Sequence, residues 1–328
     1  MESKLYDKAE VISFIKQGKL LSLAGDNKIL NDLPQGNWIA GSIPYFMDND
    51  QGKFNQDKIY VNELEHFGSN FSIKVYDKNN IHQVVKDSYD NGYTMIIFPP
   101  FSEVLQEYAL NSPNYEGLYN NPIVGWVSGI DLNSDDTPKT YEGRSGIAHT
   151  DKAVAIHVQL PENKFAQIEI VNIFERDENS PEIEFYVNSF DVINCLIDGK
   201  ETNLAEYYKQ HNIDVKLPIV ADYSGARINV SVKEIDQENG LVGFYAPVFE
   251  NVIYKFAKPV DNYVRKFEIN TIDIGEKSAF SCNCILNYLY GELEGKKINN
   301  VKGPITFGEI AYQLLNQTLV NLYIENIE

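Results

Sequence analysis

Two cysteines near the C-terminus are the first side chains that could do chemistry. Cys282 and Cys284 are separated by one residue, which differs from the CxxC spacing of redox and zinc pairs. On a strand, both side chains would point to the same face. Phe280 and Ile285 flank them, which predicts that both thiols are buried, reduced and inert. The functional alternative is that one of the thiols lines a ligand cavity.

A single acid, Glu309, stands in an otherwise apolar, glycine-rich segment. Such an acid either reaches water at the end of a strand or is paired inside the protein. Ser128 lies in GWVSG, but this segment lacks the GxSxG frame of a nucleophile elbow, so we expect a small side chain at a strand end. His149 and Asp151 flank a polar loop, and a metal site there needs a further ligand that the sequence does not indicate. The sequence therefore assigns no catalytic residue, no metal ligand and no cofactor.

Glycines at the end of a strand allow a ligand or another backbone segment to approach closely. In open α/β sheets, ligands bind at the carboxyl ends of the strands, where residues 125–129 would lie. We therefore expect a pocket with an aromatic wall from Trp126 and polar contacts from Asn283 or Glu309. The expected ligand-binding residues are Gly125, Trp126, Ser128, Gly129, Cys282, Asn283, Gly308 and Glu309. The alternative is that these residues only pack two halves of the chain together.

Stretches of helical and strand pattern must position these residues. Almost continuous apolar runs predict strands that are buried on both faces, over residues 94–99, 122–130 and 152–160. Capped helices are predicted over 79–92 and 102–110. This alternation predicts an α/β fold of two similar-sized halves, in which helices pack on mixed sheets, with an α+β arrangement as the alternative.

The charged, proline-containing segment 176–182 is the expected boundary between the halves. After it, residues 184–199 predict strands and residues 203–212 predict a short helix. Asn239 and Gly240 predict the turn of a hairpin. Residues 303–325 fit either a helix and a strand or two strands, because their periodicity does not decide between these structures.

Charge and cysteine content restrict the partners and the compartment. The 328-residue chain has 47 acidic and 28 basic residues, and its formal net charge is −19. Such a surface repels phosphate groups, which disfavours nucleic acids and anionic membranes as partners. The three cysteines, a small and odd number, indicate reduced thiols in a cytoplasmic location. No apolar run reaches the roughly 18 residues of a membrane span, and we expect no signal peptide.

Several segments of the sequence follow the order of a known family. TMIIFPPFSEVLQEYAL and NPIVGWVSGI resemble the strand ending near F-x-P, the helix and the vvGcssaG strand of FIST (F-box and intracellular signal transduction) sensory domains. AFSCNC and the GEI segment resemble the F-x-C and GEI segments of the family's C-terminal module, and Asn316 and Thr318 match its n-x-T strand. The chain departs from the family at Trp126, where a small residue or cysteine is usual, and it lacks the arginine that often follows F-x-C. The matches span residues 93–325.

The resemblance implies a division of the chain and a function. An N-terminal extension and the first part of the N-terminal half cover residues 1–92, the core of that half covers 93–180, and the C-terminal half covers 181–328. The implied function is a small-molecule-binding sensory domain, with amino acids or related metabolites as ligands, that reports through a signalling partner protein. Two alternatives stay open: an interaction or scaffold protein without a ligand, and an uncharacterised enzyme that uses Cys282 or Glu309.

Overall fold

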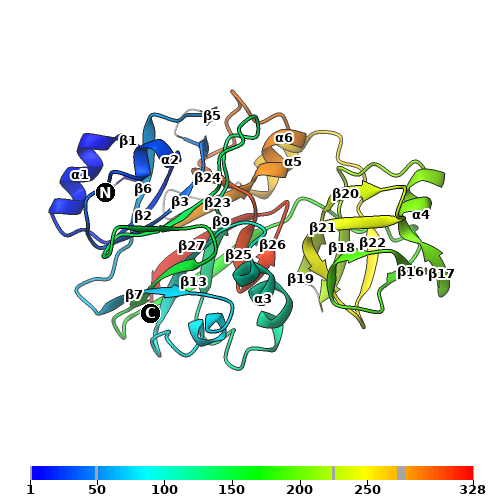
Figure 1. Ribbon diagram of the computed structural model, residues 1–328, viewed down its shortest axis with the longest axis horizontal. Helices are drawn as coiled ribbons and strands as arrows, with labels where there is room; N and C mark the ends of the chain where they lie inside the picture. The colour runs from blue at the N-terminus through cyan, green and yellow to red at the C-terminus, as the bar shows by residue number, and fades with distance from the viewer. Residues whose placement is uncertain (1, 49–50, 224–225, 272–277, 328) are drawn as a thin grey trace.

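The computed structural model describes residues 2–48, 51–223, 226–271 and 278–327. In this part of the chain, three six-stranded mixed sheets make up the larger part of the molecule, which we call the body (Figure 1). The first sheet has the order β1 (Lys4–Asp7), β6 (Lys58–Glu63), β2 (Leu21–Gly25), β3 (Trp38–Ser42), β10 (Thr140–Glu142) and β11 (Ile147–His149). The second has the order β26 (Gln313–Leu315), β25 (Glu309–Ala311), β9 (Ile123–Val127), β8 (Gly92–Phe98), β12 (Ala153–Gln159) and β7 (Phe71–Tyr76). The third has the order β13 (Lys164–Val171), β27 (Leu319–Asn326), β23 (Phe280–Cys284), β24 (Gly303–Thr306), β4 (Tyr45–Met47) and β5 (Gly52–Phe54).

Short helices pack on these sheets. Buried residues of α1 (Lys8–Lys16) and α2 (Asn27–Leu30) share a core with the first sheet, and those of α3 (Glu103–Asn111) share a core with the second. The other helices are α4 (Leu204–Gln210), α5 (Tyr263–Asn270) and α6 (Ile285–Tyr290). Mixed sheets with helices packed on them confirm the predicted α/β class. No helix among the described residues is long and apolar enough to cross a membrane.

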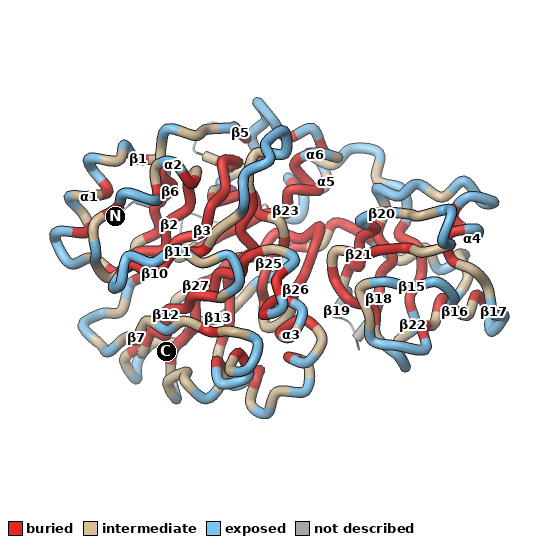
Figure 2. Tube along the Cα trace, viewed as in Figure 1, coloured by how far each residue is buried: buried red, intermediate tan, exposed pale blue. Residues whose placement is uncertain are grey.

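The position of β8 in the fold explains why the four residues from Met95 to Phe98 are all apolar. Met95 and Ile97 point into the core that the three body sheets share, whereas Ile96 and Phe98 point into the core beneath α3. Alternate side chains of a strand face opposite sides, so a strand with a core on both sides needs a continuous apolar run. Strands β9 and β12 are buried along almost their whole length in the same way, as predicted (Figure 2).

A separate β-rich part, which we call the module, comprises residues 183–256 and lies at the right of Figure 1. One of its sheets has the order β17 (Lys200–Asn203), β16 (Asn194–Ile197), β14 (Ile183–Glu184), β22 (Ile253–Phe256), β18 (Ile219–Tyr223) and β19 (Ala226–Val230). The other has the order β15 (Ser189–Val192), β21 (Leu241–Val248) and β20 (Val232–Asp236). Helix α4 follows β17, and the predicted hairpin at Asn239 and Gly240 joins β20 to β21. The module has a hydrophobic core of its own.

The segment that was expected to form the C-terminal half, 181–328, divides between these two parts. Its first portion is the module, which begins directly after the boundary expected at 176–182. Its last portion returns to the body, because β25 pairs with β9 and β27 pairs with β13 along its full length. The 303–325 segment therefore forms strands, from β24 to β27.

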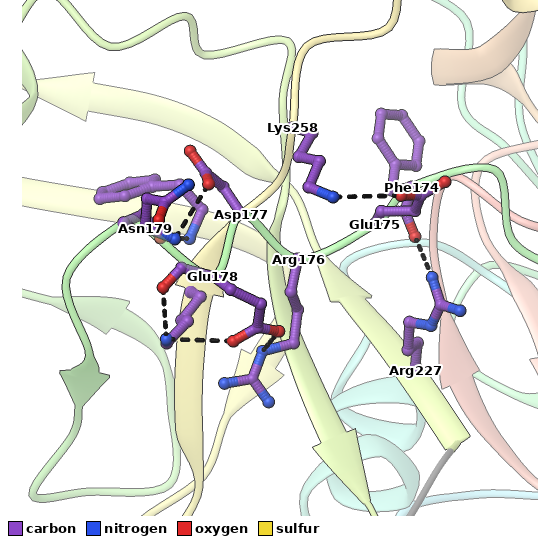
Figure 3. Close-up of polar contacts among 11 residues, drawn as sticks. Phe174, Glu175, Arg176, Asp177, Glu178, Asn179, Arg227 and Lys258 are labelled. Carbon is purple, nitrogen blue, oxygen red and sulfur yellow. Dashed lines mark hydrogen bonds and ion pairs between the residues drawn. The ribbon is translucent and has the colours of Figure 1, made fainter.

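Two linkers cross between the body and the module, and polar contacts hold them together (Figure 3). The Glu175 carboxylate accepts hydrogen bonds from Lys258 at 3.3 Å and from Lys266 at 3.2 Å. Arg176 forms an isolated bridge with Ala257, and Arg227 of the module donates to the backbone carbonyl of Phe174 at 3.4 Å. Backbone hydrogen bonds also join the two linkers, since the N–H of Lys258 donates to the carbonyl of Glu175 at 2.8 Å.

The helix predicted over 79–92 is wrong: only a 3-10 turn, Ile81–Val84, forms there. Asn80 Oδ1 accepts from the backbone N–H of Asp77, and Asp77 Oδ1 accepts from the backbone N–H of Asn79. Such local bonds compete with helical hydrogen bonds at the start of a segment. The short turn suffices to bury Ile81 and Val84, three residues apart.

Candidate functional site

The module and the body enclose a cavity of about 440 Å³, which we call the apolar pocket. Most of its lining consists of aliphatic and aromatic side chains, with a few polar groups among them. This composition and size are typical of small-molecule sites. The lining residues are Pro100, Phe101, Leu105, Gln106, Val127, Leu132, Phe190, Asp191, Lys233, Phe244, Tyr245, Cys284, Ile285, Leu286, Leu289, Phe307, Leu314 and Asn316.

Local structure explains how two helices present their apolar faces to this cavity. Helix α3 begins at the cap residue Ser102, whose hydroxyl accepts from the backbone N–H of Leu105 at 3.3 Å. Helix α6 begins directly after β23, and its residues Ile285 and Leu289 lie one turn apart on one face. Leu105 of α3 and Ile285 and Leu289 of α6 are apolar, and all three line the cavity.

Asn316 supplies the most deeply buried amide of the lining. Its side-chain oxygen Oδ1 accepts hydrogen bonds from Ser231 of the module, from the backbone N–H at 3.0 Å and from the hydroxyl at 2.6 Å. A backbone N–H can only donate, and this fixes which end of the amide is the oxygen. The nitrogen Nδ2 is buried, and it has no hydrogen-bond partner among the described residues. The residue is 1% exposed, so it is buried in the wall of the pocket.

Asn316 also belongs to a group of buried polar side chains, three amides and one hydroxyl, that joins the two parts of the molecule. We call this group, which consists of Asn229, Ser231, Asn316 and Gln317, the clasp. Asn229 Nδ2 donates to the backbone carbonyl of Asn316 at 3.3 Å and to that of Gln317 at 3.2 Å. Gln317 Nε2 donates to the carbonyl of Lys216 in the module at 3.0 Å. Gln317 has a φ of 52°, which is unfavourable for a residue with a side chain, and the surrounding bonds hold it there.

Behind the pocket wall, the buried carboxyl of Glu309 forms hydrogen bonds within the body. Its Oε2 accepts from the hydroxyl of Thr318 at 2.8 Å and from the backbone N–H of Thr318 at 3.2 Å. The hydroxyl of Thr306 donates to the other carboxyl oxygen, Oε1, at 3.5 Å. Burial raises the pKa of Glu309 to about 8, although these bonds lower it in part, so the carboxyl is mainly protonated at neutral pH.

Both cysteines of β23 are neutral thiols in this environment. Burial raises the pKa of Cys282 and that of Cys284 well above the usual range, and the neighbouring Glu309 raises both further. Cys284 lines the apolar pocket, whereas Cys282 donates to the backbone carbonyl of Gly125 at 3.5 Å. All three cysteines of the chain are free and buried, which confirms that the two on this strand are unbridged.

Large hydrophobic side chains are exposed at the mouth of the apolar pocket. Phe101 is 61% exposed, Leu132 is 47% exposed and Leu289 is 42% exposed. Lys233 lies over the Phe101 ring at 5.3 Å and forms an ion pair with Glu234 at 2.8 Å. The charge of Lys233 is therefore already paired, and Asp191 is the other charged residue of the lining.

The eight residues expected to bind a ligand do come together, but they lie in the core beside the pocket. Glu309 is the register partner of Trp126, and Cys282 contacts Gly125. Trp126 points into the core of the three sheets, where Gly41 leaves room for its ring. None of the eight lines the apolar pocket. Their sequence neighbours Val127, Cys284 and Phe307 do so.

The space beside two glycines of the expected site, Gly125 and Gly129, is filled by other protein atoms. A Cβ on Gly125 would lie 1.8 Å from the carbonyl oxygen of Ile96, and one on Gly129 would lie 2.4 Å from the Phe307 ring. Because Gly129 has no side chain, the ring of Phe307, a residue of the pocket wall, packs directly against it. Asn283 bonds locally, since its Oδ1 accepts from the backbone N–H of Cys284 at 2.8 Å.

A second cavity of about 440 Å³ has a more polar and charged lining, which includes Asp214, Lys216, Asp261 and Glu292. His157 is buried between Tyr76 and Thr94, each with a hydrogen-bonding atom 2.8 Å from one ring nitrogen, so it is satisfied within the core. In the described parts of the chain, no group of three or more His, Cys, Asp or Glu residues could hold a metal ion.

Comparisons with known proteins identify a family. No curated protein matches this chain. A family model described as "Family of unknown function (DUF6976)" matches residues 6–325, which include the body strands, the module and the lining of the apolar pocket. The chain therefore belongs to the DUF6976 family.

Proposed function

We propose that this protein binds a small molecule in the apolar pocket and acts as a sensory protein. The observation that carries the proposal is the buried Nδ2 of Asn316, a hydrogen-bond donor without a partner among the described residues, in the wall of an apolar cavity of about 440 Å³. A donor left unpaired in such a place is unfavourable, and a ligand acceptor removes the penalty.

The resemblance to FIST sensory domains supports the same function. It implies amino acids or related metabolites as ligands, and the apolar lining favours uncharged metabolites of this class with a large apolar group over free amino acids, which are zwitterions. We also propose a cytoplasmic location, in which the free thiols Cys195, Cys282 and Cys284 stay reduced.

The clasp suggests how binding is reported. Asn316 lines the pocket and at the same time accepts two hydrogen bonds from Ser231 of the module. A ligand that contacts both parts binds best in one relative orientation of body and module, and it shifts the population toward that orientation. A signalling partner protein that recognises this orientation would receive the signal.

A pair of matched variants tests ligand binding in this pocket. Leu289→Trp fills the mouth from a half-exposed position, and Ile253→Trp makes a similar change at a site on β22 that is 43% exposed and outside the lining. We expect amino acids and their amides and esters to include compounds that raise the melting temperature of the wild-type protein and of Ile253→Trp, but not of Leu289→Trp.

The exposed apolar mouth favours one alternative, an interaction protein without a ligand. Phe101, Leu132 and Leu289 form part of a rim that a partner's side chain could cover. If no compound stabilises the wild-type protein, and Leu289→Trp instead abolishes binding to a partner, then the interaction function holds and the sensory proposal is wrong.

A further inference from the structure

We infer that the ligand is an uncharged, mainly apolar molecule whose carbonyl oxygen accepts a hydrogen bond from Nδ2 of Asn316. This inference rests on the proposed function, because it names the chemistry of the molecule that the same pocket takes. Ketones, esters and amides carry the required oxygen, which accepts hydrogen bonds and donates none.

The direction of the hydrogen bond follows from Ser231. Its backbone N–H donates to Oδ1 of Asn316 at 3.0 Å, so a rotated amide would place two donors against each other. Nδ2 is therefore the group that stays without a partner among the described residues. An N–H group requires an acceptor from the ligand, and an ammonium group or another donor cannot satisfy it.

The charge of the ligand follows from where the ionic groups lie. Among the described lining residues, Lys233 is the only lysine or arginine, and it is exposed at the mouth and paired with Glu234. Cys284, another buried residue of the wall, has a free thiol and offers no positive charge to a ligand. A carboxylate at Asn316 would be buried without a cation, which is costly, whereas a carbonyl oxygen carries no such penalty.

The apolar part of the ligand follows from the rest of the wall. Phe244 and Phe190 of the module line the cavity together with Leu286 and Leu314 of the body. These side chains offer no hydrogen bonds, so they gain most from an aliphatic or aromatic group. A molecule that reaches from Asn316 to the mouth contacts both parts of the protein.

Four probes of similar length separate the contributions of the carbonyl oxygen, the charge and the apolar chain to binding. They are nonan-2-one, its alkene analogue 2-methylnon-1-ene, octanoate and octylammonium. We expect nonan-2-one to bind the wild-type protein at least about tenfold more tightly than either ion, measured by calorimetric titration. Asn316→Asp keeps the acceptor for Ser231 and removes the donor. This substitution should weaken the binding of nonan-2-one by roughly tenfold relative to the binding of the alkene.

Asn62→Asp is the control, because Asn62 is a buried asparagine on β6 outside the pocket. It should leave the ratio of ketone to alkene affinity unchanged. If the probes bind but Asn316→Asp weakens ketone and alkene equally, or if octanoate binds as tightly as the ketone, the inference is wrong while the pocket stands. If none of the four probes binds the wild-type protein, the inference is wrong. The proposed function also fails if, in addition, no amino-acid compound raises the melting temperature of the wild-type protein.

Discussion

Glu309 and Asn316 are buried polar side chains on the same stretch of the body, yet their hydrogen bonds are completed to different degrees. Glu309 accepts from Thr318 and contacts Cys284, and all of these groups belong to the body. Asn316 takes its donors from Ser231 of the module and keeps a donor beside the apolar pocket. A polar group that is satisfied within one part holds that part together. A polar group that spans two parts and keeps an unused donor is suited to binding and to signalling.

The largest expected effect concerns the stability of the body. Glu309→Ala leaves the backbone N–H and the hydroxyl of Thr318 without their acceptor and creates a cavity, so we expect a loss of about 3 kcal/mol in the free energy of unfolding. Glu309→Gln keeps an oxygen for Thr318 and should cost about 1 kcal/mol or less at neutral pH. Urea unfolding measures both variants. A loss below about 1 kcal/mol for Glu309→Ala would mean that this carboxyl does not hold the body together.

The same carboxyl predicts a dependence of stability on pH. Burial raises the pKa of Glu309 from 4.5 to about 8, so between these values the native protein keeps a proton that the unfolded chain has released. The stability due to this proton is complete below about pH 4.5 and is lost progressively up to about pH 8. The slope is at most roughly 1.4 kcal/mol per pH unit.

Glu309→Gln is the matched control for this titration, because it removes the titrating group and leaves all others in place. The stability of Glu309→Gln minus that of the wild-type protein should therefore rise as the pH is raised from 5 to 8 in urea unfolding experiments. A difference that stays constant with pH contradicts a raised pKa at this position.

A smaller effect is expected at the clasp. Ser231→Ala removes a hydroxyl that lies 2.6 Å from Oδ1 of Asn316, and we expect a loss of about 1–2 kcal/mol together with weaker ligand binding. Ser281→Ala is the matched control, since the Ser281 hydroxyl is buried without a partner among the described residues. It should change the unfolding free energy by about 0.5 kcal/mol or less. Equal effects of the two substitutions would count against the clasp.

Part of the fold is predictable from the sequence, because a strand with a hydrophobic core on each side has an almost continuous run of apolar residues. The apolar runs at 94–99, 122–130 and 152–160 correspond to β8, β9 and β12. The pairing of distant segments is less predictable. The sequence indicated that the segments around Trp126 and Glu309 lie together, but nothing in the sequence of β27 indicates that it pairs with β13.

The candidate site was predictable only as a neighbourhood. The segments around Gly125, Cys282 and Glu309 meet, as their glycines and small residues indicated. The alternation of side chains along a strand then decides which residue reaches the cavity, and a shift by one residue exchanges Trp126 for Val127. In the sequence, Asn316 is recognisable only as part of the n-x-T match, which does not indicate that it lines a pocket. Its importance comes from Ser231, 85 residues away, which fixes its orientation.

The central claim is that Nδ2 of Asn316 binds a carbonyl oxygen in the apolar pocket. The most direct measurement is the NMR signal of the Asn316 side-chain amide in protein labelled with ¹⁵N at asparagine, assigned by its absence in Asn316→Asp. On titration with nonan-2-one, we expect the amide proton signal to move downfield and to saturate, while 2-methylnon-1-ene causes a much smaller shift. Saturable binding of nonan-2-one that leaves this signal unmoved would contradict the claim.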